Sequence, residues 1–213
     1  MKEYHKIETL FERDEGTKKL IIGKFRNETI EYLKDNNWLF TEKIDGTNIR
    51  VLWDGHRVTF SGRTDTSQMP SHLMNKLFEL FSGEVNEEMF EQKFGETPVI
   101  LYGEGYGTKI QSGGSYRLDV SFILFDVEID NLFLKRESVE DIAKYFGLEV
   151  VPIVCTGTIQ NGVDFVLSHA NSTIGTAVME GVVGRPQTEL FDRRGNRVIV
   201  KIKRKDFSQK GEK

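Results

Sequence analysis

Residues 38–53 read WLFTEKIDGTNIRVLW, in which two apolar runs flank the polar stretch TEKIDGTN at positions 41–48. Aromatic and β-branched residues dominate both runs, so each predicts a strand, and the Asp45-Gly46 pair between them predicts a turn. Lys43 therefore stands at the end of the first strand. A lysine in this place is either a solvated surface charge or a nucleophile. Because a Lys-x-Asp-Gly string is short enough to occur by chance, the rest of the chain has to decide.

Length and charge narrow the class of protein. The chain has 213 residues, a formal net charge of −4 and a single cysteine, Cys155, which cannot form an intramolecular disulfide. We find no signal peptide and no apolar run of the roughly 20 residues that cross a bilayer, so we expect a cytoplasmic protein of one domain, residues 1–213, with no membrane contact. The negative charge excludes a protein that coats nucleic acid nonspecifically. Local contacts remain open at the basic carboxyl end, which carries Arg197, Lys201, Lys203, Arg204, Lys205, Lys210 and Lys213.

Strand-like segments outnumber helical ones. Periodicity predicts helices over residues 71–81, 84–94 and 137–146 and a weaker one over 161–170, while Asp54-Gly55 predicts a hairpin turn. The irregular placement of the helices favours an α+β fold with mainly antiparallel sheets. The predicted strands are LIIGKF, WLFTEKI, NIRVLW, RVTFSG, PVILYGEG, VSFILFDVEI, VVPIV, AVMEGVVGRP and RVIVKIK.

Two carboxylates interrupt apolar strands. Glu104 ends the run VILYGE and shares a strand face with Ile100 and Tyr102. It is either a solvated strand end or a binding group. Glu180 lies inside the apolar run AVMEGVV, where a carboxylate costs free energy unless it is exposed, paired or bound to a cation.

Two further segments carry an aromatic residue and a pair of lysines. Phe125 shares a strand face with Ile123 and Val127, which by itself indicates a core position. In VIVKIK, Val198, Val200 and Ile202 line one strand face, and Lys201 and Lys203 project together from the other. Such a pair can hold a phosphate, although a solvated sheet face is the commoner reason for alternating lysines.

The order of these segments along the chain argues against chance. It resembles the motif series of the covalent nucleotidyltransferases, the superfamily of polynucleotide ligases and mRNA capping enzymes, over residues 38–207. The matching residues are Lys43, Arg63 in SGR, Glu104, Phe125-Asp126, Glu180-Gly181 and Lys201-x-Lys203. Asn48 stands where DNA ligases and capping enzymes typically have arginine, so the chain most resembles the phage-type, nick-sealing RNA ligases that repair RNA. Asp45, where some members of that family have histidine, keeps a minimal DNA ligase open as an alternative.

The resemblance implies a reaction that begins on Lys43. Its amine attacks the α-phosphorus of ATP, releases pyrophosphate and forms a lysyl-AMP, from which AMP passes to an RNA 5′-phosphate before a 3′-hydroxyl seals the strand. Only the neutral amine is nucleophilic, and a lysine with the reference pKa of ~10.4 is almost entirely protonated at neutral pH. We expect Lys201, Lys203 and a divalent cation, Mg²⁺ or Mn²⁺, to disfavour the ammonium form and to stabilise the transition state.

The resemblance also implies roles for the other matching residues. Glu42 and Ile44 lie at the base edge, Phe125 stacks on adenine, Glu104 holds the ribose, and Arg63 contacts phosphate or the RNA end. Glu180, Asp126 and Asn48 are the expected metal contacts. Asn48 would order metal-bound water or the terminal nucleotide of the acceptor strand, and Asp126 is either a ligand in the later steps or a strand-end cap.

The implied fold is an ATP-grasp-like nucleotidyltransferase domain with flanking helices and a nucleotide pocket between its sheets. We expect no OB-fold and no carboxyl-terminal RNA-binding domain, so that RNA with 5′-phosphate and 3′-hydroxyl ends would bind weakly unless an auxiliary RNA-binding protein helps. Besides the DNA ligase, two alternatives stay open. One is a nucleotide-binding sensor of RNA ends without turnover, and the other is a structural α+β protein whose charges are solvated.

Overall fold

The computed structural model describes residues 3–111 and 113–207. The chain forms two compact units. Unit 1 comprises Met1–His5 and Asp45–Val151, and unit 2 comprises Lys6–Ile44 and Pro152–Lys213. Each unit has a sheet and an apolar core of its own. Lys210 and Lys213 of the basic carboxyl end lie outside the described residues.

Unit 1 is built on a six-stranded sheet with the order β10–β8–β7–β5–β6, and β9 pairs with β8. All neighbouring strands are antiparallel except β8 and β10. The backbone NH of Asp54 donates to Arg57 O at 3.2 Å, which confirms the predicted hairpin turn between β5 and β6. The strands are β5 (Thr47–Trp53), β6 (Val58–Ser61), β7 (Val99–Gly107), β8 (Val120–Ile129), β9 (Leu132–Phe133) and β10 (Glu149–Val150).

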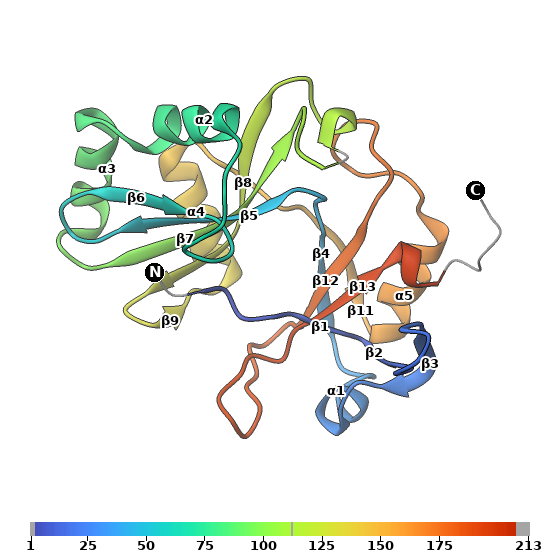
Figure 1. The fold of residues 1–213 in the computed structure, drawn as a ribbon. Coiled ribbons are helices and arrows are strands. Elements are labelled where there is room, and N and C mark those ends of the chain that lie inside the picture. The colour runs from blue at the N-terminus through green and yellow to red at the C-terminus, as the bar shows by residue number, and fades with distance from the viewer. Residues whose placement is uncertain (1–2, 112, 208–213) are drawn as a thin grey trace. The chain divides into compact units, whose positions relative to one another are not determined.

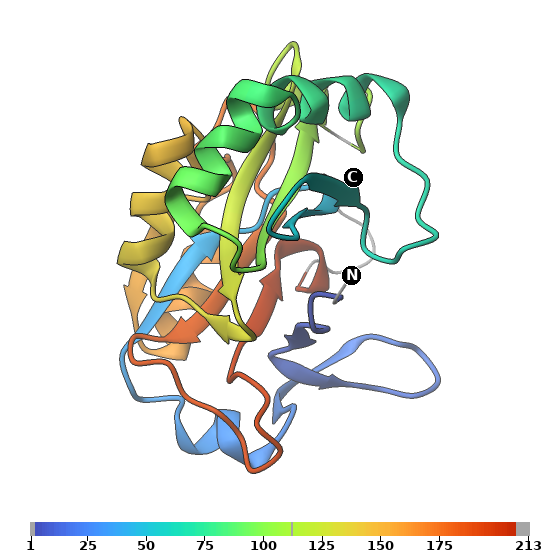
Figure 2. The ribbon, with the colours of Figure 1, turned by 90° about the vertical axis from the view of Figure 1, so that its left-hand side faces the viewer.

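Three helices cover one face of this sheet (Figure 1, Figure 2): α2 (Ser71–Phe81), α3 (Glu84–Phe94) and α4 (Arg136–Phe146). The buried residues of α2 are Leu73, Leu77 and Phe81, which are spaced by four and so lie on one side of the helix. Gly147, with a left-handed φ of 64°, ends α4. The helices predicted over 71–81 and 84–94 are confirmed to the residue, and the third begins one residue before its predicted start.

Unit 2 holds a five-stranded sheet with the order β1–β13–β12–β4–β11, of which only β1 and β13 are parallel. Helix α5 packs on this sheet through Ile159, Val163 and Val166, and its amino terminus is fixed by a capping box between Thr158 and Asn161. The strands are β1 (Glu8–Thr9), β4 (Trp38–Glu42), β11 (Ile153–Gly157), β12 (Gly181–Pro186) and β13 (Val200–Lys203).

Smaller elements complete both units. Unit 2 has a two-stranded sheet of β2 (Phe11–Arg13) and β3 (Leu20–Phe25), helices α1 (Glu28–Tyr32) and α5 (Ile159–Ser168), and the 3-10 helix η2 (Arg204–Asp206). Unit 1 has the 3-10 helix η1 (Gly113–Ser115). The five-residue α1 has no predicted counterpart, and α5 begins two residues before the predicted helix. No helix within the described part of the chain is long and apolar enough to cross a bilayer.

The α+β fold with mainly antiparallel sheets is confirmed, but several predicted strands are too long. VVPIV is wrong as one strand: Val150 ends β10 in unit 1, Ile153 begins β11 in unit 2, and Pro152 between them has no NH to donate to a strand ladder. The run AVMEGVVGRP becomes a strand only at Gly181, and RVIVKIK only at Val200. Of the apolar residues before these points, Ala177, Met179, Val198 and Ile199 are buried although they lie outside the strands, whereas Val178 is exposed.

Candidate active site

Lys43 and Lys203 share one carboxylate in unit 2. Lys43 Nζ lies 2.7 Å from Glu180 Oε2, and Lys203 Nζ lies 2.5 Å from Glu180 Oε1. The strand order explains the meeting, because β12 lies between β4 and β13 and Glu180 immediately precedes it. Lys43 follows β4, and its backbone NH donates to Gly181 O at 2.9 Å. Three segments that are distant in sequence therefore converge on one ion-paired cluster.

The glycine after Glu180 is required by close packing. Gly181 has a φ of 152°, and a Cβ atom there would overlap the carbonyl of Ile202 on β13. Gly181 is paired with Lys203 in the strand register. The Glu-Gly pair of the sequence motif thus lets β12 start close enough to β13 for the Glu180 carboxylate to reach the lysine.

Burial and opposite charges act against each other on Glu180. Burial raises the pKa of its carboxyl, but the charges of Lys43 and Lys203 and the hydrogen bonds from both lysines outweigh it, so the pKa lies below its ordinary value of 4.5. Glu180 is therefore ionised at neutral pH. The Lys43 side chain is therefore held by an ionised carboxylate.

Lys201 adds a third positive group on the same strand face as Lys203. Its neighbours Val200 and Ile202 are buried in the unit 2 core, as the alternation in the sequence predicts. Burial, and then the charges of Lys203 and Lys43, lower the pKa of Lys201, while Glu8 acts to raise it. The surplus of positive charge among these lysines gives the cluster the electrostatics of an anion site.

Glu42, the residue before Lys43, is held by a loop that the sequence analysis did not single out. Only 1% of Glu42 is exposed. Its Oε2 accepts hydrogen bonds from the Thr173 backbone NH at 2.9 Å and from Thr173 Oγ1 at 2.5 Å, and its Oε1 accepts one from Ser172 Oγ. Ser172 and Thr173 lie in a small hairpin, residues 170–179, which is closed by the bridge between Asn171 and Val178. Ile44, the expected base contact after Lys43, is also buried, with 3% of it exposed.

Asn48 and Glu104 lie opposite each other in unit 1. They are direct partners in the register of β5 and β7. Asn48 Oδ1 is buried, and within the described residues it accepts no hydrogen bond. The strands approach here because Gly46 has no side chain: a Cβ atom would overlap the carbonyl of Gly105. The glycine of Lys-x-Asp-Gly is thus needed for close backbone packing against β7.

Phe125 lies at a bulge in β8. Tyr102 pairs with Asp126 and Gly103 with Leu124, so Phe125 is the extra residue between them. The bulge reverses the alternation of the strand. Val127 packs in the helix-covered core with Leu124, and the prediction that Phe125 and Val127 share a face is wrong.

Beyond the bulge, Asp126 is fully buried and accepts a hydrogen bond from Tyr4 Oη at 2.8 Å. The ring of Tyr4 also packs edge-on against that of Phe125, with 5.1 Å between ring centroids. Tyr4 is thus a partner of both residues that the sequence motif predicted.

Arg63 is exposed on a loop that a second arginine holds in place. Arg50 on β5 is fully buried; its Nε donates to Gly62 O at 2.7 Å and its Nη2 to Asp65 Oδ1 at 2.8 Å. The Arg50 guanidinium thus holds Gly62 before Arg63 and Asp65 after it.

Most of the chain matches a known protein family in sequence. The sequence model of the RNA ligase family matches residues 36–203, which is most of the chain. The chain belongs to the RNA ligase family. The match runs through both units and covers Lys43, Glu104, Glu180 and the lysines of β13.

Solved RNA ligases have the same fold as this family member. A mutant of Naegleria gruberi RNA ligase with ATP and manganese superimposes with a TM-score of 0.61 at 18% sequence identity, over 84% of this chain and 54% of the other. The same enzyme with pyrophosphate superimposes with a TM-score of 0.61 at 20% sequence identity, over 82% of this chain and 51% of the other. A mutant of this enzyme with AMP and manganese superimposes with a TM-score of 0.62 at 18% sequence identity, over 82% of this chain and 52% of the other. The chain therefore spans about half the length of these ligases, and its α+β fold is that of an RNA ligase nucleotidyltransferase.

The predicted site residues of this RNA ligase family member divide between the units. Unit 2 contains Glu42, Lys43, Ile44, Glu180, Lys201 and Lys203. Unit 1 contains Asn48, Arg63, Glu104, Phe125 and Asp126. Within residues 3–111 and 113–207, no three His, Cys, Asp or Glu side chains are grouped as metal ligands.

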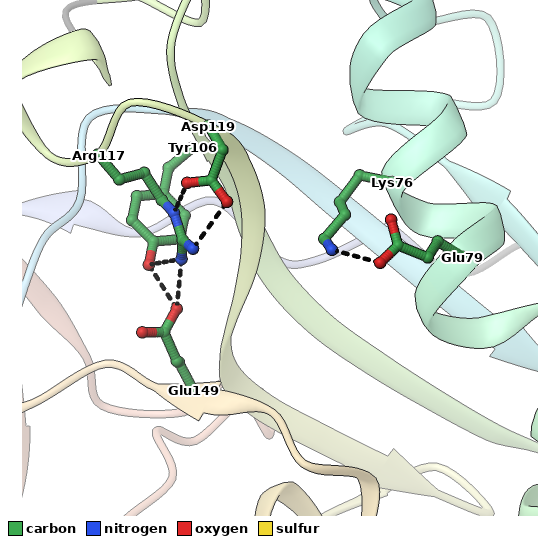
Figure 3. A network of polar contacts seen from close by, with 6 residues as sticks. All are labelled: Lys76, Glu79, Tyr106, Arg117, Asp119 and Glu149. Carbon is green, nitrogen blue, oxygen red and sulfur yellow. Dashed lines mark hydrogen bonds and ion pairs between the residues drawn. The ribbon is translucent and has the colours of Figure 1, made fainter.

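A polar network at the end of β7 contains none of the predicted site residues (Figure 3). Arg117 Nε donates to Asp119 Oδ1 at 2.5 Å, and its Nη1 donates to Tyr106 Oη at 3.1 Å and to Glu149 Oε2 at 2.9 Å. Tyr106 Oη donates to the same Glu149 oxygen at 2.6 Å. Burial and the bond to Glu149 raise the pKa of Tyr106 to about 12. The network links β7, the loop before β8, and β10, and it consists of one guanidinium held by two carboxylates and a tyrosine hydroxyl.

Proposed function

We propose that this chain is the adenylyltransferase domain of an ATP-dependent RNA ligase, formed by both units. It would join 5′-phosphate and 3′-hydroxyl RNA ends through a lysyl-AMP on Lys43 and an adenylylated 5′ end. The observation that carries the proposal is the cluster in which Glu180 holds Lys43 and Lys203 in a member of the RNA ligase family. Binding of ATP and manganese, named for the solved ligases, supports the choice of nucleotide and metal.

The unit 2 lysines supply the charge that the first step requires. Attack by the Lys43 amine on the α-phosphorus of ATP forms an N–P bond, breaks the bond to the leaving pyrophosphate and places developing charge on phosphate oxygens. Lys201 and Lys203 are positioned on one strand face to neutralise that charge. Glu180 holds Lys43 in place until the anion arrives. A triphosphate competes with Glu180 for the same ammonium groups, and this competition releases Lys43.

The residues fit a divalent metal of the hard, oxygen-binding type. Mg²⁺ usually binds through one or two carboxylates and keeps several waters, so a site with a single carboxylate can hold it. In unit 2, Glu180 would supply the carboxylate. In unit 1, Asn48 Oδ1 is buried and accepts no hydrogen bond within the described residues, so it is a separate candidate contact for a metal or its bound water. Asp126 would contribute in the later steps. When bound, Mg²⁺ or Mn²⁺ supplies positive charge that stabilises the phosphate transition state.

The remaining assignments are specific to the nucleotide and the RNA. Glu42 and Ile44 would lie at the base edge, Phe125 would stack on adenine, Glu104 would bind the ribose, and Arg63 would contact the RNA end. RNA binding would depend on further contacts, supplied within this chain or by an auxiliary RNA-binding protein.

Intact-mass measurement after incubation with ATP and magnesium tests the first step. We expect a gain of one covalent AMP that pyrophosphate reverses and that Lys43→Ala abolishes. Lys144→Ala, which removes an exposed lysine on α4, is the matched control and should adenylylate normally. Lys201→Ala and Lys203→Ala should each slow the step by about 2 to 4 kcal/mol of transition-state stabilisation. An unchanged mass with every nucleotide and divalent metal tried would overturn the proposal.

Sealing assays test the polynucleotide. We expect nicks with an RNA 3′-hydroxyl end to be sealed faster than all-DNA nicks of the same sequence. Faster sealing of DNA would favour the minimal DNA ligase. Adenylylation of the protein without any sealing would favour an RNA-end sensor.

A further inference from the structure

The segment between β12 and β13, residues 187–199, forms a hairpin that extends away from the unit 2 sheet. Figure 1 shows it as the orange-red loop that leaves the end of β12 and returns into β13. The backbone NH of Val198 donates to Leu190 O at 2.8 Å, and a bridge joins Phe191 to Arg197. At its base, Gln187 N donates to Asn37 O at 2.9 Å. The hairpin is therefore an ordered projection that is anchored on the loop before β4.

The carboxylates of this hairpin are occupied by interactions within it. Asp192 Oδ1 accepts from the backbone NH groups of Arg194 and Asn196, both at 2.8 Å, and Oδ2 accepts from Asn196 Nδ2 at 3.0 Å. Gly195, with a φ of 77°, closes the turn. Glu189 pairs with the guanidinium of Arg197, whose side chain is only 3% exposed. Both negative charges thus serve to hold the hairpin in shape.

The side chains left at the tip are two arginines and an aromatic ring. Arg193 and Arg194 are exposed, and neither forms an ion pair with a residue in the described part of the chain. Phe191 is 58% exposed, so its ring is accessible to a ligand. The tip therefore has two guanidinium groups against the one carboxylate of Asp192, beside an accessible ring, on a chain whose net charge is −4.

We propose that this tip, formed by Phe191, Arg193 and Arg194, docks on the RNA strand. Guanidinium groups bind phosphates through paired hydrogen bonds, and an exposed ring beside them can stack on a base. The tip has both kinds of group, side by side on one turn. Phosphate contacts position a polynucleotide without reading its sequence, as a ligase that acts on breaks requires. The inference rests on the proposed RNA ligase function and adds an RNA-binding surface to it.

Salt-dependent binding of the full chain to a nicked RNA duplex tests the tip. In the double variant Arg193→Ala with Arg194→Ala, we expect the affinity to fall roughly tenfold or more. The slope of log affinity against log salt should fall by about 0.9 for each phosphate that the variant no longer neutralises. Arg193→Lys with Arg194→Lys should keep most of the slope. Phe191→Ala should reduce the affinity roughly tenfold with the slope unchanged, because stacking involves no counterion release.

The matched control removes the same charge from another hairpin of unit 2. Lys18→Ala with Lys19→Ala changes two exposed lysines in the turn between β2 and β3 and should bind RNA within twofold of the wild type. RNA affinity and salt slope of the arginine variant equal to those of this control would overturn the inference. So would a reduced affinity with an unchanged slope. If poly-glutamate competes for the wild type while the arginine variant binds RNA normally, the tip is assigned to an acidic protein instead.

Adenylylation separates this inference from the proposed function. The tip contains none of the residues placed at the lysyl-AMP step. The arginine variants and Phe191→Ala should therefore gain AMP at the wild-type rate. A wild type that never gains AMP contradicts the proposed function. A wild type that gains AMP normally, with RNA binding unaffected by the tip variants, contradicts only the inference drawn from the hairpin.

Discussion

The hydrogen bonds that Ser172 and Thr173 donate to Glu42 allow a direct test of how the site is built. The double variant Ser172→Ala with Thr173→Val removes both hydroxyl donors and leaves only the Thr173 backbone NH on a carboxylate that is 1% exposed. A hydrogen bond to a charged group contributes about 1.5 to 3 kcal/mol, so two of them sum to about 3 to 6 kcal/mol. Because entering water replaces part of this, we expect the free energy of unfolding to fall by about 3 kcal/mol.

Urea denaturation measures this loss of unfolding free energy, and the same double variant made in a Glu42→Gln protein shows what causes it. With slopes of about 1 to 3 kcal/mol per molar urea, the unfolding midpoint should fall by about 1 M or more. In the Glu42→Gln background the same double variant should cost about 1 kcal/mol, because a neutral amide is less expensive to leave without donors. The control, Thr156→Val with Ser168→Ala, changes the same residue types at exposed positions of unit 2 and should stay within about 0.5 kcal/mol of the wild type.

Two outcomes would refute the reasoning. One is a loss below about 1 kcal/mol in the double variant, which would mean that the hydroxyls do not compensate the buried charge. The other is an equal loss with glutamate and with glutamine at position 42, which would assign the cost to packing. Since Glu42 is proposed to lie at the base edge, the double variant should also raise the KM for ATP more than it lowers kcat in adenylylation.

Three further predictions concern Glu180, Arg50 and Gly46. The folded-state pKa of Glu180 is lowered, so its ion pairs stabilise the protein fully above about pH 4.5. This stabilisation is lost as the pH falls through the folded-state pKa. The difference in unfolding free energy between wild type and Glu180→Gln, measured in urea, should therefore shrink from pH 7 to pH 3. Arg50→Lys cannot hold both sides of its loop, so trypsin should cleave after Arg63 several-fold faster; an unchanged cleavage rate would contradict this role. Gly46→Ala should lose at least about 2 kcal/mol in unfolding free energy, whereas Gly114→Ala, where a Cβ meets no atom, should be neutral; equal effects would count against the packing argument.

Local patterns predicted local structure well. The spacing of Leu73, Leu77 and Phe81 sufficed for α2, because a helix face is set by residues three and four apart. The alternation in β13 likewise placed Lys201 and Lys203 on one face. Predictions failed where a neighbouring strand decided the outcome. The bulge at Phe125 depends on how β7 pairs with β8, and no alternation within β8 alone can reveal it.

By itself, the sequence determined which reactive groups exist, their order along the chain and the strand faces from which the lysines of β13 project. Only the tertiary structure decided that Glu180 contacts Lys43, which is 137 residues away in sequence. It also decided that Ser172 and Thr173 hold Glu42, from which they are 130 and 131 residues away. These contacts follow from the strand order β13–β12–β4 and from the hairpin before β12. Strand order is set by burial of the whole sheet, which is a property of all its strands together, so no single segment could have specified it.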